Sequence, residues 1–180
     1  MSIFTITRSL KSQEGVLFFY TRCCMLTLIK GFFNPRKGVL AVYTAITLAK
    51  YIVTKCVNDN VPISNLQLQK ILYYIQKYYL SNGGLAFSDE IEAWQFGPVV
   101  PDVYYRFCVF GAMPITSTYN NVEIAPIDAS IIDRIVEEKR MLNPWDMVRE
   151  THAKHGAWHK TYRDGAGNHQ IIPHKWIKGS

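Results

Sequence analysis

The sequence is poor in cysteine and in the motifs that identify common enzymes. Its four cysteines form no CxxC pair and no disulfide-framework spacing. Cys23, Cys24, Cys56 and Cys108 are therefore predicted to be reduced thiols of a cytoplasmic protein. A GxSxG nucleophile motif and a Walker A phosphate loop are also absent. Enzymes that depend on either motif are excluded, and we expect neither catalysis nor a cofactor.

Long hydrophobic runs are also scarce. Residues 16–33, GVLFFYTRCCMLTLIKGF, are the only candidate for a membrane segment or a signal peptide. Arg22 lies inside this run, where a central charge costs about 2.5–3.5 kcal/mol on insertion scales. No A-x-A-like cleavage site follows the run. We therefore predict a protein without a membrane partner.

Acidic residues are few only at the beginning of the chain, although the formal net charge is +6. Residues 1–40 hold six Lys or Arg against one acid, Glu14, which leaves 14 basic and 13 acidic residues in 41–180. Binding to nucleic acid needs a basic face for the phosphates. Because residues 41–180 are nearly neutral, we predict that the folded body binds no nucleic acid.

The length of 180 residues suffices for one sizeable core and is too short for two full domains. A stretch with two Gly and one Pro, residues 31–38, indicates a boundary. We expect residues 1–40 to be an atypical basic extension and residues 41–180 to form the folded domain.

Apolar residues recur every three or four positions in two long segments. The first predicts a helix over about 43–57. The second begins at Ser64, with Gln67 at the spacing of a capping box, and stops at Gly83 and Gly84. It is apolar or aromatic almost all round, so we expect it to be the central helix. Its core stripe consists of Leu68, Ile71, Leu72, Ile75 and Tyr79.

Three later helices have recognisable start signals. Pro101 and Pro144 suit the first helical position, whereas Asp128 and Asn143 suit the N-cap. The predicted helices run over about 101–107, 128–140 and 144–154.

Extended segments are short and few. The sequences IEAWQF, VEIA and HQIIP suit strands, which is too little for more than a small sheet. We expect Gly97 and Pro98 to turn the chain between the first strand and the helix at Pro101. The predicted fold class is mainly α, a compact multi-helix domain with a small antiparallel β patch.

All histidines of the chain follow residue 151. They are His152, His155, His159, His169 and His174. His152 and His155 are three residues apart, whereas a zincin site needs a spacing of four with a Glu between. No Cys lies nearby to complete a ligand set. We predict no metal site, and a metal-dependent hydrolase that uses these histidines remains an alternative function.

Tyr73, Tyr74 and Tyr78 lie off the core stripe of the central helix. Such residues either complete a core with their hydroxyls at its edge or anchor a partner protein. Tyr74 and Tyr78 are four residues apart and share a helix face. They are the predicted partner-binding residues of a protein that acts by binding.

Two neighbouring stretches, LQLQKILYYIQKYYLSNGG and EIEAWQFGPVVPDVYYRF, carry a family resemblance. Together they resemble the signature of the Panacea-domain family, the SocA-like antitoxins that include GepA-like phage-associated proteins. A weaker match follows in THAKHGAW, and the resemblance covers about residues 43–172. The matching positions are Leu68, Lys70, Leu72, Tyr73, Gln76, Ala93, Trp94, Gly97, Pro98, Val99, Pro101, Tyr104, His152 and Trp158.

The resemblance implies a non-enzymatic, mainly helical domain that occurs in bacterial or prophage genomes beside a small toxic protein. The expected function is that of an antitoxin, which neutralises its cognate toxin by direct binding. Delivery of the toxin to a protease is a second route, and a DNA-binding autoregulator is a further alternative. The signature positions are expected to be structural.

Overall fold

The computed structural model describes residues 42–180. The predicted extension over 1–40 and the hydrophobic run over 16–33 lie outside this range. Within it, no helix combines the length and the hydropathy that crossing a membrane requires.

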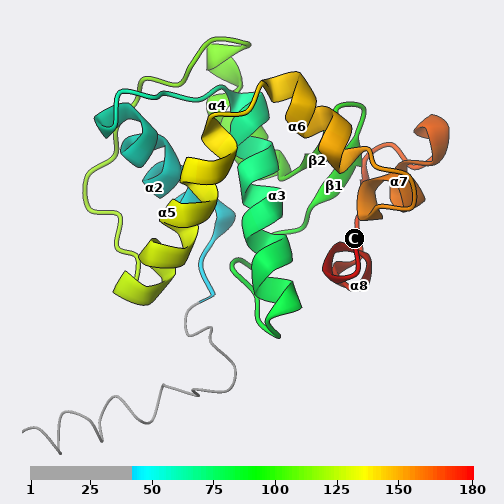
Figure 1. Cartoon of the computed structure of the whole chain (residues 1–180). Coiled ribbons are helices and arrows are strands. Elements are labelled where there is room, and N and C mark those ends of the chain that lie inside the picture. The colour runs from blue at the N-terminus through cyan, green and yellow to red at the C-terminus, as the bar shows by residue number, and fades with distance from the viewer. Residues whose placement is uncertain (1–41) are drawn as a thin grey trace, which may run out of the picture.

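The helix over Asn65–Ser81, α3, stands at the centre of the fold (Figure 1). It packs against the helices α2, α5, α6 and α8 and against the strand β2. The predicted capping box is present, because the Ser64 hydroxyl accepts from the Gln67 backbone N–H while the Gln67 side chain accepts from the Ser64 N–H. The predicted core stripe of this helix is fully buried.

The other helices surround α3. Their bounds are α2 Ala45–Asn58, α4 Pro101–Phe107, α5 Pro126–Arg140, α6 Pro144–Thr151, α7 Ala157–Tyr162 and α8 His174–Lys178, with short 3₁₀ turns η1 Cys108–Phe110 and η2 Arg163–Gly165. The helix at Pro101 has the predicted bounds, and Asn143 caps α6 as expected. The helix α6 ends at Thr151 rather than near Lys154, because His152 is already its C-cap. Sequence periodicity does not reveal the short helices α7 and α8.

The prediction that Asp128 caps a helix was wrong. The helix α5 starts two residues earlier, with Pro126 in its first turn. Asp128 lies inside that turn and is completely buried. Its carboxylate accepts hydrogen bonds from the hydroxyls of Tyr79, at 2.6 Å, and Tyr43, at 2.8 Å. A buried carboxylate thus ties α5 to α3 and to the residues before α2.

Three short strands form one antiparallel sheet in the order β2-β1-β3. They are β1 Glu92–Trp94, β2 Gly97–Val99 and β3 Gln170–Ile171. The turn predicted at Gly97 and Pro98 was misplaced, because the hairpin turns at Gln95 and Phe96 and the Gly-Pro pair lies in β2. The segment VEIA forms no strand. The predicted fold class, mainly α with a small antiparallel β patch, is confirmed.

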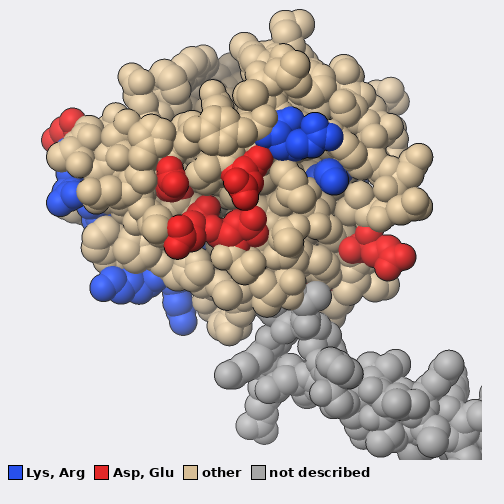
Figure 2. Space-filling model, turned by 180° about the vertical axis from the view of Figure 1, so that it is seen from behind, with Lys and Arg blue, Asp and Glu red and all other residues tan. Residues whose placement is uncertain are grey.

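Charged side chains are spread over the surface with both signs present. Figure 2 shows one face of the molecule, on which acidic side chains gather near the middle and basic ones lie around them in separate groups. This face offers no continuous basic surface to a phosphate backbone.

Candidate partner-binding groove

Two neighbouring side chains of α3 hold the open edge of the hairpin. The Lys70 ammonium donates to the Pro98 carbonyl at 3.0 Å, and the Gln69 side-chain carbonyl accepts from the Val100 N–H at 2.9 Å. Both side chains are buried, and Lys70 is completely so. Burial lowers the pKa of Lys70 to about 7, because a low-dielectric site disfavours the charged ammonium. The signature residues Lys70 and Pro98 therefore form one structural joint.

Gly97 is required by the same joint. Its φ of +106° is a conformation that side chains disfavour. A Cβ at this position would lie 2.7 Å from the Lys70 Nζ and 2.9 Å from the Thr151 hydroxyl. Any larger residue would collide with the lysine that holds the hairpin in place.

Two further signature residues hold neighbouring backbone segments in place by hydrogen bonds. The Gln76 side chain donates to the Phe87 carbonyl and accepts from the N–H groups of Ala86 and Phe87. The Trp158 indole donates to the backbone carbonyl of Trp94 at 2.8 Å. These bonds satisfy buried polar groups that would otherwise be costly, which supports a structural role for both residues.

Five further signature positions are buried or begin a helix. Leu68, Leu72 and Ala93 are fully buried. The nearly buried Tyr73 shares a hydrogen bond of 3.0 Å with the Ser180 hydroxyl, and Pro101 begins α4.

His152 lies flat against Trp158, with ring centroids 3.5 Å apart. Its Nε2 atom is buried and has no hydrogen-bond partner among residues 42–180. Burial first, and then the positive charges of Lys70 and His159, lower the pKa of His152 to about 4. The imidazole is therefore neutral at physiological pH and acts as a flat packing surface.

The other histidines do not converge with His152. The rings of His155 and His159 are 6.4 Å apart, and His169 lies beside Trp94. Within the described range, no three His, Cys, Asp or Glu side chains are arranged to hold a metal ion.

A groove opens between the hairpin, α4 and the start of α6. Its cavity volume is about 560 Å³, within the range of about 300–1,000 Å³ that is usual for binding pockets. Its aromatic lining consists of Trp94, Phe96, Tyr104, Tyr105 and Trp145. Trp94, Val99 and Tyr104 are signature positions, so the joint described above fixes one wall of this groove.

The aromatic rings of the groove contact one another edge to face. Trp94 is 4.9 Å from Tyr104 and 6.1 Å from Tyr105, measured between ring centroids. Phe96 and Trp145, from the hairpin turn and the first turn of α6, are 5.6 Å apart. These contacts hold the rings in place and leave large parts of them open to solvent. Tyr105 is 63% exposed and Trp145 is 54% exposed.

Two polar side chains that line the groove, Asn65 and Gln69, are bonded within the protein. Asn65 donates to the Tyr104 carbonyl and accepts from the Gln69 amide. Gln69 in turn accepts from Val100, as described above. No Lys, Arg, Asp or Glu lines the groove. His169 also lines it, with its Nδ1 atom 3.4 Å from the Glu92 carboxylate. The lining is therefore mainly aromatic, with a few polar side chains.

The predicted partner-binding residues Tyr74 and Tyr78 lie on a different surface. Both are half-buried. The Tyr74 hydroxyl donates to the Glu150 carboxylate at 2.6 Å, and the Lys139 ammonium lies 4.4 Å from the Tyr74 ring centroid. The Arg134 guanidinium covers Tyr78 at 5.6 Å. The two tyrosines share a face, as predicted, and contact side chains of α5 and α6.

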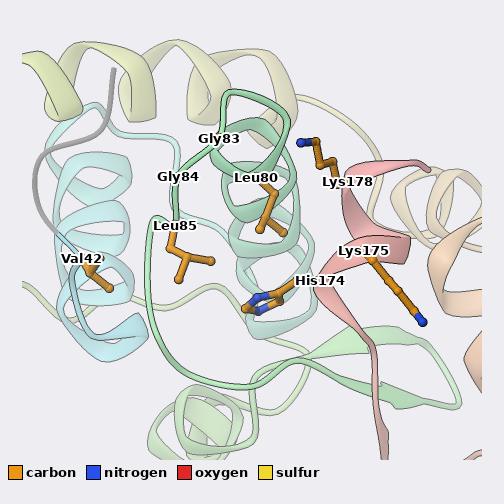
Figure 3. A pocket seen from close by; sticks show the side chains of 8 residues that line it. All are labelled: Val42, Leu80, Gly83, Gly84, Leu85, His174, Lys175 and Lys178. Atoms are coloured by element: carbon orange, nitrogen blue, oxygen red, sulfur yellow. The ribbon is translucent and has the colours of Figure 1, made fainter. Parts of the chain in front are cut away.

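A second hollow lies between the end of α3 and α8 (Figure 3). Its volume is about 510 Å³, and Leu80, Leu85 and His174 are among its lining residues. The side chain of Lys175 points away from Leu80 and Leu85 (Figure 3). This hollow therefore lacks the convergent side chains that distinguish the aromatic groove.

The comparisons with known proteins agree with the structural signature. A family model described as antitoxin SocA-like, Panacea domain, matches residues 68–159. This match covers half of the chain. The chain belongs to the SocA-like Panacea-domain family. The matched range contains all five aromatic residues of the groove, and the resemblance stated from the sequence is confirmed.

One curated relative of this family is the antitoxin SocA of Caulobacter vibrioides (strain NA1000 / CB15N). It is 30% identical to the chain over 124 residues, which cover 62% of the chain and 66% of the relative. The chain thus spans just under two thirds of the length of this Panacea-domain protein. No solved structure matches the chain significantly.

Sequence reasoning missed the groove as a site, although it identified Trp94, Val99 and Tyr104 as signature positions. Phe96 and Tyr105 lie beside these residues in the sequence, whereas Trp145 is about 40 positions further on. The cluster of aromatic residues around the Gly-Pro pair could have indicated a binding site. The same cluster is equally typical of a packed joint between helices, so it did not distinguish the two.

Proposed function

We propose that this protein is an antitoxin that neutralises a cognate toxin by binding it directly. Membership in the SocA-like Panacea-domain family supports the antitoxin role. The observation that carries the binding mechanism is the open aromatic groove beside the family signature. Exposed Trp, Tyr and Phe side chains in a pocket are the usual anchors of protein–protein binding.

The proposed role is non-enzymatic and cytoplasmic. A hydrolase would need its histidines to converge, and His152 instead packs against Trp158. A DNA-binding autoregulator would need a basic face, which the nearly neutral charge of residues 41–180 disfavours. Delivery of the toxin to a protease would also begin with toxin binding, so the groove serves that route equally.

The toxin could bind at either of two surfaces, the aromatic groove or the surface around Tyr74 and Tyr78. The groove exposes its rings to solvent, whereas Tyr74 already uses its hydroxyl on Glu150 and its ring on Lys139. A partner that binds Tyr74 must first break these internal contacts. The groove is therefore the better candidate, and the Tyr74 and Tyr78 surface remains the earlier prediction.

Co-expression tests both the function and the surface. The product of the gene adjacent to this one is expressed alone or with the antitoxin, and bacterial growth is measured. We expect growth to stop with the gene product alone and to recover with the wild-type protein. The double variant Phe96→Ala, Trp145→Ala should fail to restore growth.

The double variant Tyr74→Ala, Tyr78→Ala is the matched comparison. If this variant fails while the groove variant restores growth, the Tyr74 and Tyr78 surface binds the toxin. If the wild-type protein itself never restores growth and never binds the adjacent gene product, the proposed function is wrong.

A further inference from the structure

Exposed hydrophobic side chains concentrate at the groove. Among residues 42–180, ten large hydrophobic side chains are exposed, and four of them line this one groove. They are Phe96, Tyr104, Tyr105 and Trp145. A monomeric protein rarely leaves neighbouring aromatic side chains open to water unless a partner covers them.

The chemistry of the lining selects the kind of partner. A charged side chain that enters the groove would lose water and find no Lys, Arg, Asp or Glu among the lining residues. The one imidazole of the lining, His169, already has its Nδ1 atom 3.4 Å from the Glu92 carboxylate. The amides of Asn65 and Gln69 are bonded to the protein itself. An apolar or aromatic side chain, by contrast, loses nothing on entry and contacts aromatic rings. Because no Lys, Arg, Asp or Glu lines the groove, its lining favours a segment that inserts uncharged side chains.

The arrangement of the rings provides two places for such side chains. Phe96 and Trp145 form one edge-to-face pair from the hairpin turn and α6. Tyr104 and Tyr105 form a second, 5.5 Å apart on α4, against Trp94. A segment that crosses the groove can therefore insert side chains at both pairs.

We propose that the groove binds a short uncharged segment of the toxin that inserts apolar or aromatic side chains beside Phe96–Trp145 and Tyr104–Tyr105. This inference rests on the proposed antitoxin function and adds the chemistry of the segment that is bound. The groove recognises this segment by its apolar side chains, and ion pairs contribute little to the affinity.

The test measures binding of the purified adjacent gene product to the full-length protein by calorimetry. Trp145→Ala and Tyr105→Ala should each weaken binding about 30-fold, the effect of losing an anchor worth about 2 kcal/mol. Tyr105→Phe should retain most of the affinity, because it keeps the ring. Ile127→Ala is the matched control, since Ile127 is 45% exposed on α5 and does not line the groove.

Salt dependence and peptide mapping examine the chemistry. Affinity should change little between about 0.1 and 1 M NaCl, over which the Debye length falls from about 10 to 3 Å. Overlapping peptides of the adjacent gene product should identify a segment with apolar side chains and no charge at the inserted positions. A steep loss of affinity with salt, or a bound segment that is strongly charged, would overturn the inference.

The outcomes separate the two proposals. If the gene product binds with wild-type affinity to the folded Trp145→Ala and Tyr105→Ala variants, the groove inference fails while the antitoxin function stands. If these variants instead lose only self-association, the groove binds a second copy of this chain and the inference is wrong. If the wild-type protein does not bind the gene product, the function itself fails. Melting temperatures confirm that each variant is folded.

Discussion

Replacing Lys70 by Met should change how stability depends on pH. Lys70 is completely buried, and burial lowers its pKa from an ordinary value of 10.5 to about 7. Between these values the folded state holds Lys70 neutral while the unfolded state keeps it protonated. The unfolded state therefore binds more protons, and the free energy of unfolding rises with pH. The stability that the neutral Lys70 supplies is fully present above pH 10.5 and is lost as pH falls through about 7.

The magnitude follows from the proton difference. One proton of difference changes the free energy of unfolding by about 1.4 kcal/mol per pH unit. Between about pH 7.5 and 9, the wild-type protein should gain about 2 kcal/mol relative to Lys70→Met. The variant also loses the hydrogen bond to the Pro98 carbonyl, which costs about 1 kcal/mol at every pH. Losing this bond lowers the unfolding free energy of the variant equally at every pH, so it does not change how that free energy depends on pH.

Urea unfolding followed by tryptophan fluorescence measures both proteins across this range. Tyr43, Tyr51 and Tyr79, whose pKa values burial raises, are present in both proteins, so the difference between the two curves isolates Lys70. We expect the difference in unfolding free energy to grow steadily with pH. Two parallel curves would show instead that Lys70 keeps its charge in the folded protein.

Gly97→Ala should destabilise the protein by about 3 kcal/mol or more in urea unfolding, because the positive φ is unfavourable for Ala and the new Cβ collides with Lys70. Gly83 also has a positive φ but has open space around it, so Gly83→Ala should cost only about 1–2 kcal/mol. Equal losses of stability in the two variants would exclude the collision. His152→Phe should keep the ring stack on Trp158 and lower the pH at which acid unfolds the protein. The stability that the neutral His152 supplies above pH 6.5 is lost as pH falls through about 4, and Phe has no such loss. An unchanged midpoint of acid unfolding would contradict this. A protein that starts at residue 42 should keep the helical circular-dichroism signal and cooperative melting of the full chain, and loss of either would show that residues 1–41 belong to the folded domain.

The helices that the sequence predicted well are those with strong local signals. The Ser64 and Gln67 capping box and the proline at position 101 act within a few residues, so they can be read without a three-dimensional context. Asp128 resembles an N-cap for the same reason. Its real partners, Tyr43 and Tyr79, lie 85 and 49 residues away, and such long-range bonds override a local preference.

The groove was not predictable for a related reason. Its lining residues come from α3, the hairpin, α4, the start of α6 and the loops after η1 and before β3, and only the packing of these elements brings them together. The sequence could identify Trp94 and Tyr104 as special. It could not show that Trp145 joins them, or that Tyr74 would use its hydroxyl on Glu150.

Site-specific photo-cross-linking can measure whether the toxin contacts the aromatic groove. A benzophenone amino acid replaces Tyr105 in the groove or, in a separate protein, Ile127 on α5. Each protein is irradiated in cells that co-express the adjacent gene product. We expect a covalent adduct with that gene product from position 105 and none from position 127. An adduct from position 127 alone, with none from 105, would contradict it.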